Sequence, residues 1–172
     1  MLPKLLLLVP LAVLLVGPAP GEDKKDKEDP DAEFRKLPKE AKEILEAAES
    51  FELYSLDPAG GKLPKDADGF QGWKVLGKTE IKDADTRKKV RAALDKGIAQ
   101  GIGAAGCFKP RHGIRATAKD KSVDLVICFE CMTIMVMVGD KAQAVWTSAA
   151  PQKTLNKILR DAKVPLPKQK DE

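Results

Sequence analysis

Four residues able to do chemistry lie close together in the sequence: Cys107, His112, Cys128 and Cys131, which are the only histidine and all three cysteines of the chain. They follow the pattern C-x4-H-x15-C-x2-C. Three thiolates and one imidazole are a known ligand set for tetrahedral zinc. A bend at Pro110 would fold the first two ligands back towards the C-x-x-C pair. The pattern therefore predicts a local Cys3His site, with zinc as a structural metal.

The same cysteines also fit a disulfide, because bridges are expected in proteins that leave the cytoplasm. Three cysteines allow one bridge and one remaining thiol. Cys128 and Cys131 are three positions apart, so in a regular strand they point to opposite faces of the sheet. That geometry favours a bridge from Cys107 to one of them, whereas a bulge at residues 129–130 would let the C-x-x-C pair close.

An enzymatic site is the third interpretation. Cys107 would be a nucleophile and His112 its base, with Arg111 and Arg115 favouring the thiolate. No residue is placed by the sequence to orient the histidine, so the pattern favours a protein that is not an enzyme. A redox role of the C-x-x-C pair is disfavoured because no helix is predicted to follow it.

Two further binding motifs are weaker. Cys131, Met135 and Met137 share strand parity and would suit Cu(I), although methionines in an apolar strand usually fill a core. Residues 101–106 read GIGAAG, which matches a dinucleotide-binding pattern. These glycines follow a predicted helix instead of opening one, so we interpret them as a helix stop and connector.

Two segments carry a resemblance to known proteins. Residues 107–114 read CFKPRHGI and residues 126–131 read VICFEC. Together they resemble small exported bacterial proteins of uncharacterised function that share a C-x-x-P-x-H-x-I segment and an I-C-F-x-C segment. The resemblance covers residues 107–131 and implies that the cysteines and the histidine form one local unit. It implies no ligand, activity or catalytic residue.

The first residues have the layout of a secretory signal peptide. Lys4 precedes an apolar run, residues 5–16, and small residues and prolines follow up to Gly21. The run is shorter than the roughly 20 residues that span a bilayer as a helix, and Pro10 interrupts it. We expect residues 1–21 to be removed and the mature chain, without a membrane span, to be periplasmic or secreted. A component of the cell envelope is one candidate role for it there.

Charge and composition divide the rest of the chain. Residues 22–36 are almost all charged, which predicts a disordered linker. Residues 37–166 are expected to form one domain, followed by a short tail, residues 167–172. The net charge is +4, but the lysines are scattered and only 5% of residues are aromatic, a composition that argues against nucleic-acid binding.

Hydrophobic periodicity predicts an α+β domain. The expected order is α-β-β-α-β-β-β-α, with a mostly antiparallel sheet of about five strands and two to three packed helices. Residues 83–101 give the clearest helix, because apolar residues recur every fourth position from Val90 to Ile98. Residues 112–117 and 122–130 are expected to form a hairpin, and residues 151–162 a closing helix.

Overall fold

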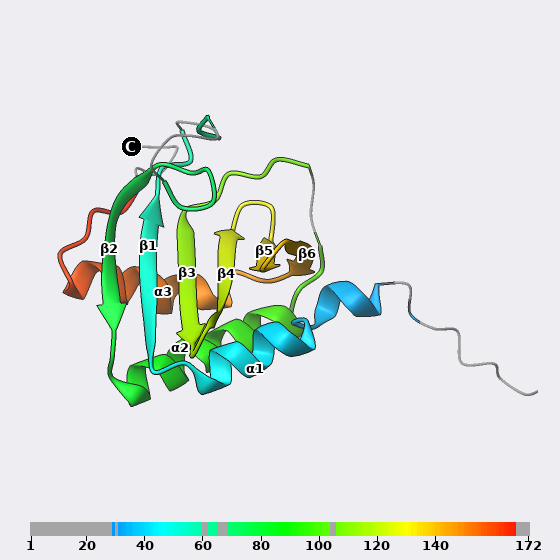
Figure 1. The fold of residues 1–172 in the computed structure, drawn as a ribbon. Helices are drawn as coiled ribbons and strands as arrows, with labels where there is room; N and C mark the ends of the chain where they lie inside the picture. The colour runs from blue at the N-terminus through cyan, green and yellow to red at the C-terminus, as the bar shows by residue number, and fades with distance from the viewer. Residues whose placement is uncertain (1–28, 30, 60–61, 65–68, 104–105, 168–172) are drawn as a thin grey trace, which may run out of the picture.

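The computed structural model describes residues 29, 31–59, 62–64, 69–103 and 106–167 (Figure 1). The predicted signal peptide, most of the predicted linker and nearly all of the predicted tail lie outside these residues. Among the helices described, none has both the length and the apolar character that crossing a membrane requires.

One antiparallel sheet of six strands forms the centre of the fold, in the order β2-β1-β3-β4-β5-β6. The strands are β1 (Ser50–Leu56), β2 (Val75–Ile81), β3 (His112–Ala118), β4 (Lys121–Cys128), β5 (Thr133–Val138) and β6 (Lys141–Trp146). The predicted α+β class and antiparallel sheet are confirmed. The predicted number of strands is one too few.

The strand that the prediction lacked results from a turn at the C-x-x-C segment. The sequence from Val123 to Val138 is apolar and lacks glycine and proline, so nothing in it announces a turn. In the structure, β4 ends at Cys128, residues 129–132 form a turn, and β5 returns antiparallel from Thr133. Met132 has a φ of +49°, a left-handed conformation that few non-glycine residues adopt and that reverses the chain here.

Three helices pack on one face of the sheet: α1 (Lys39–Ala47), α2 (Ala84–Ala99) and α3 (Ala150–Asp161). The predicted central and closing helices are confirmed. Asp83 caps α2 by accepting a hydrogen bond of 2.7 Å from the backbone N–H of Thr86. Val90, Leu94 and Ile98 are buried, so the predicted inner face of this helix is the observed one.

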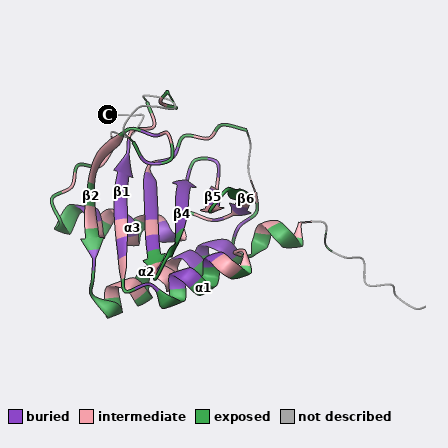
Figure 2. Cartoon of the chain, viewed as in Figure 1, coloured by how far each residue is buried: buried purple, intermediate pink, exposed green. Residues whose placement is uncertain are grey.

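The main core lies between the sheet and the helices, where β1, β3 and β4 are buried along most of their length (Figure 2). Leu53, Ile114 and Leu125 from three neighbouring strands pack there with Leu94 of α2 and Leu155 of α3. Strand residues alternate between the two faces of a sheet. We call the other side of the sheet, which faces away from the helices, the open face.

A smaller apolar cluster covers part of the open face. Phe70 and Trp73, from the segment between β1 and β2, pack there on Tyr54 and Val126. The ring of Phe70 lies directly on Gly113, where an added Cβ would come within 2.5 Å of a ring carbon. Glycine at this position therefore allows the loop to close onto the sheet.

The end of the predicted charged linker differs from the prediction, because Ala32–Arg35 form a 3-10 helix, η1. Phe34 stacks on Trp146 of β6 at 5.3 Å between ring centroids, and the guanidinium of Arg35 lies 5.6 Å from the centroid of that tryptophan ring. An aromatic contact and a cation–π contact thus order the last residues before the domain.

Candidate functional site

His112 and Cys128 lie on neighbouring strands but on opposite faces of the sheet. His112 of β3 is in register with Ile127 of β4, and Ile127 belongs to the core on the helix side. Cys128 is the next residue along β4, so its side chain points to the open face, as that of Val126 does. The four predicted ligands are therefore not brought together.

No metal-ligand set is present among the residues that the structure describes: no three His, Cys, Asp or Glu side chains stand in positions to hold one ion. The predicted Cys3His zinc site does not fit the fold, because its histidine faces the helices. The predicted pair of Cys107 as nucleophile and His112 as base is not formed either, since the histidine ring bonds to Asn156 of α3 instead.

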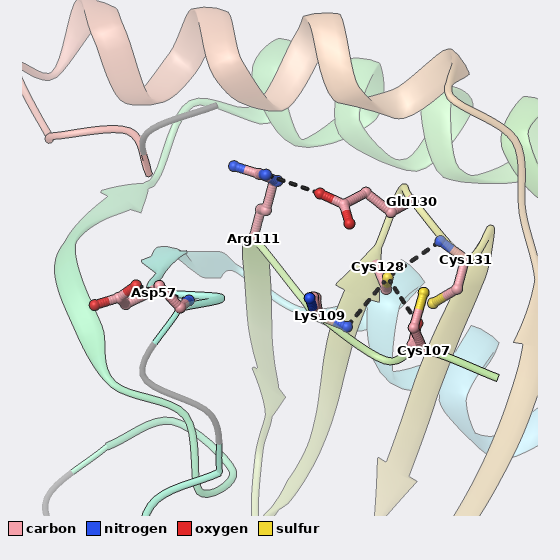
Figure 3. Close-up of polar contacts among 8 residues, drawn as sticks. Asp57, Cys107, Lys109, Arg111, Cys128, Glu130 and Cys131 are labelled. Atoms are coloured by element: carbon pink, nitrogen blue, oxygen red, sulfur yellow. Dashed lines mark hydrogen bonds and ion pairs between the residues drawn. The ribbon is translucent and has the colours of Figure 1, made fainter. Parts of the chain in front are cut away.

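The three cysteines, in contrast, are neighbours at one end of the sheet (Figure 3). Cys107 is exposed and comes from the connector between α2 and β3. Cys128 ends β4 and Cys131 lies in the following turn, and both are buried. The sequence predicted this association of the connector with the C-x-x-C pair, but not the exclusion of the histidine.

The sulfur of Cys128 makes several hydrogen bonds to the backbone. It accepts hydrogen bonds from the backbone N–H of Cys131 at 3.2 Å and from that of Lys109 at 3.4 Å. Its thiol also points to the carbonyl oxygen of Cys107 at 3.8 Å. These contacts link the connector to the turn (Figure 3).

Cys131 has a different environment. Burial raises the pKa of its thiol to about 12, with further contributions from the hydrogen bond and charge of Cys128 and from the charge of Cys107. The backbone N–H of Lys109 opposes this only in part. At neutral pH Cys131 is therefore a protonated thiol, whose reduced form gains nothing from ionisation.

An ion pair closes the same end of the sheet. Arg111 donates to a carboxylate oxygen of Glu130 in the turn at 2.8 Å, and its backbone N–H bonds to the carbonyl of Ile127 at 3.1 Å. Arg115, the other arginine considered as a thiol activator, instead makes a two-point contact with Asp124 at 2.7 and 2.6 Å. The guanidinium of Arg115 is therefore engaged by Asp124.

His112 is buried where β3, α3 and the C-x-x-C turn meet. Its Nε2 lies 2.7 Å from the amide oxygen of Asn156, which can only accept, so Nε2 carries the proton. Its ring contacts the edge of Phe129 at 5.3 Å between centroids. Burial lowers the pKa of His112 to about 4, with Arg111 adding to the effect and the Asn156 hydrogen bond opposing it.

Asn156 and Phe129 are the site residues that the sequence interpretation missed. The sequence places Asn156 on a helix with no hint of its partner, since the contact spans 44 positions. Phe129 lies between the two cysteines and is the only aromatic residue in the turn, which is the one signal in the sequence that could have identified it. Its burial on the helix side, away from both sulfurs, depends on the turn.

A surface cavity of about 760 Å³ lies apart from the cysteines, between α2 and α3. Lys89, Lys153 and Lys157 contribute to its lining, and the last of these pairs with Asp161 at 2.6 Å. Its lining includes no cysteine or histidine.

Comparison of the chain with protein-family models, with curated proteins and with solved structures found no match.

Proposed function

We propose that this chain is an exported, non-enzymatic α+β protein in which a disulfide between Cys107 and Cys131 fastens the connector to the C-x-x-C turn. The observation that carries the proposal is the exposed thiol of Cys107 beside the buried thiol of Cys131, at the point where the connector crosses the turn (Figure 3). Cys128 is then the spare thiol.

The choice of Cys131 as the partner of Cys107 follows from the two environments. The sulfur of Cys128 already accepts two backbone hydrogen bonds, which a rotation of its side chain towards Cys107 would break. The thiol of Cys131 has a raised pKa, so its reduced form lacks the stabilisation that a thiolate provides. Disulfides are strongly oxidising when their reduced form is stabilised. A bridge through Cys131 is accordingly the more stable one.

Bridge formation requires an oxidant, for which a small disulfide suffices. The thiolate of Cys107 attacks one sulfur of that disulfide, which forms a mixed disulfide and releases one small thiolate. Cys131 then loses its proton and attacks the sulfur of Cys107, which releases the second small thiol. The small disulfide is reduced by two electrons and the two cysteines are oxidised by two. Cys107 is the one exposed thiol of the three, so an external reagent reacts with it first.

Export supports this chemistry, because disulfides persist mainly outside the cytoplasm. The proposed signal peptide, residues 1–21, would deliver the chain to such a compartment. The charged residues that follow would then separate the domain from the site of cleavage.

A soft metal ion bound by three thiolates is the second candidate. The two N–H donors on the sulfur of Cys128 favour it, since hydrogen bonds to a ligand atom are a regular part of metal sites. Zn²⁺ and Cu(I) both accept thiolate ligands. This candidate needs the cysteine side chains to rearrange, and it has no role for His112.

The two candidates separate in one experiment on protein purified without reductant or chelator. Intact mass spectrometry after alkylation in denaturant should find one modified thiol, and peptide mapping should join Cys107 to Cys131. Cys128→Ser should retain the bridge and Cys107→Ser should lose it. Three thiols that become alkylated only after a chelator is added, together with a bound ion in the native mass spectrum, would overturn the proposal. Three thiols that react without a chelator would also overturn it.

A further inference from the structure

His112 lies beneath the thiol site, in contact with the one residue of the turn that faces the helices. We propose that His112 is a positioning residue for Cys131: its ring seats Phe129 and so holds the C-x-x-C turn closed, and protonation of the ring opens the turn. This rests on the proposed thiol site and adds its regulation by acid. It also explains why the histidine is close to the three cysteines in the sequence although it lies on the other face of the sheet.

The contacts of His112 join three parts of the fold. Its Nε2 donates to Asn156 of α3, and its ring meets Phe129, which is buried on the helix side of the turn. Phe129 lies directly between Cys128 and the rest of the turn. Movement of this aromatic ring would therefore displace the backbone that places Cys131.

The other ring nitrogen, Nδ1, is buried and has no hydrogen-bond partner. Ser55 of β1 is in register with His112, and its hydroxyl is likewise buried without a partner. A neutral ring with a proton on Nε2 leaves Nδ1 as an acceptor, and the serine hydroxyl on the neighbouring strand has a proton to donate. A second proton on the ring would turn Nδ1 into a donor that carries charge.

The surroundings offer such a charge little compensation. From α3 the ring meets the neutral amide of Asn156, and from β1 it meets the hydroxyl of Ser55. Arg111, adjacent on the chain, disfavours a second positive charge, and it pairs with Glu130, the nearest carboxylate of the turn. No described carboxylate pairs with the ring. A buried cation without a partner is costly, so acid should drive the ring towards solvent.

The test measures how strongly the fold protects Cys131 from a disulfide reagent that works in acid, dithiodipyridine. The protein is the reduced mature chain of Cys107→Ser/Cys128→Ser, so that only Cys131 reacts. At each pH, the protection factor is the reaction rate of an unstructured peptide with the same thiol, divided by the reaction rate of the protein. This ratio removes the intrinsic pH dependence of the thiol and leaves the protection by the fold.

Protection should fall by at least about tenfold between about pH 7 and about pH 4.5 when His112 is present. The fall should be absent in His112→Gln, whose amide can still donate to Asn156 but does not titrate in this range. Equal falls in both proteins would overturn the proposal. The presence of the proposed Cys107–Cys131 bridge is tested separately, by peptide mapping at neutral pH. The bridge and the acid response of His112 can therefore fail independently.

A second variant keeps the test decisive if His112→Gln does not fold. Asn156→Asp offers the imidazolium a carboxylate partner, so the buried charge costs less and the fall in protection between about pH 7 and about pH 4.5 should shrink. Asn156→Ser removes the amide oxygen without adding a charge and serves as its control. A purely structural role for residue 156 would weaken protection in both variants at all pH values, and a fall in Asn156→Asp as large as that in the parent protein would contradict the proposal.

Discussion

His112 and Cys128 lie on paired strands, one register position apart, and face opposite sides of the sheet. The histidine contacts α3 and the underside of the C-x-x-C turn, whereas the cysteine meets the connector on the open face. The cluster of chemically active residues in the sequence is thus two sites that share one turn.

Oxidation should stabilise the domain and chelation should not. If Cys107 and Cys131 are bridged, the oxidised protein should exceed the reduced one in unfolding free energy by about 3 kcal/mol, because the bridge restricts the unfolded chain. Denaturant titrations with and without reductant check this, and Cys107→Ser should remove the difference. A melting temperature that falls on addition of a chelator, with no response to reductant, would instead support the metal site.

Acid should weaken the fold through His112. Its pKa is about 4 in the folded protein, against an ordinary value of 6.5. Between these two pH values the unfolded chain binds a proton that the folded protein does not. The contribution of His112 to the free energy of unfolding is therefore fully present above about pH 6.5 and is lost as the pH falls towards 4. The loss should reach about 3 kcal/mol. Denaturant titrations across this range should show a smaller loss for His112→Gln than for the natural sequence.

Gly113→Ala should destabilise the domain by about 2 kcal/mol, because the new methyl group would collide with the ring of Phe70. The open-face loop would have to lift from the sheet to relieve the contact. Gly106→Ala is the matched control, since its Cβ would meet nothing within 4 Å. Equal unfolding free energies for the two variants would contradict the packing described here.

Arg115→Met should also destabilise the protein, by about 2 kcal/mol. Asp124 is buried and would keep only the side-chain amide of Gln71 as a partner. Replacing both charges, in Arg115→Met/Asp124→Leu, should recover part of the loss, because no unpaired carboxylate remains buried. Lys88→Met, on the exposed surface of α2, controls for the loss of a positive charge. A single variant as stable as this control would contradict the assigned role of the pair.

Export can be tested directly on the expressed full-length chain. The mature protein recovered from outside the cytoplasm should begin at Glu22, after removal of residues 1–21. Deletion of the apolar run, residues 5–16, should leave the chain inside the cell with its full remaining N-terminus. N-terminal peptide mass spectrometry distinguishes these forms, and an uncleaved full-length chain in the cytosol would contradict the prediction.

Much of the fold was predictable from local patterns. The helical period of Val90, Leu94 and Ile98, with a capping aspartate before it, predicted α2, and the spacing of two β-rich segments predicted the β3–β4 hairpin. These signals are local because capping, periodicity and strand alternation each act over a few residues. The extra strand was not predictable in this way, since Met132 turns the chain with none of the residues that usually mark a turn.

The sequence by itself determined that the three cysteines and the histidine belong to one region, and that the connector meets the C-x-x-C pair. Only the tertiary structure decided on which side of the sheet each residue lies. Strand register sets that side with a period of two residues, so a shift by one position exchanges the faces. The register is settled by packing against α1, α2 and α3. That packing turned His112 towards Asn156 and left the cysteines together on the open face.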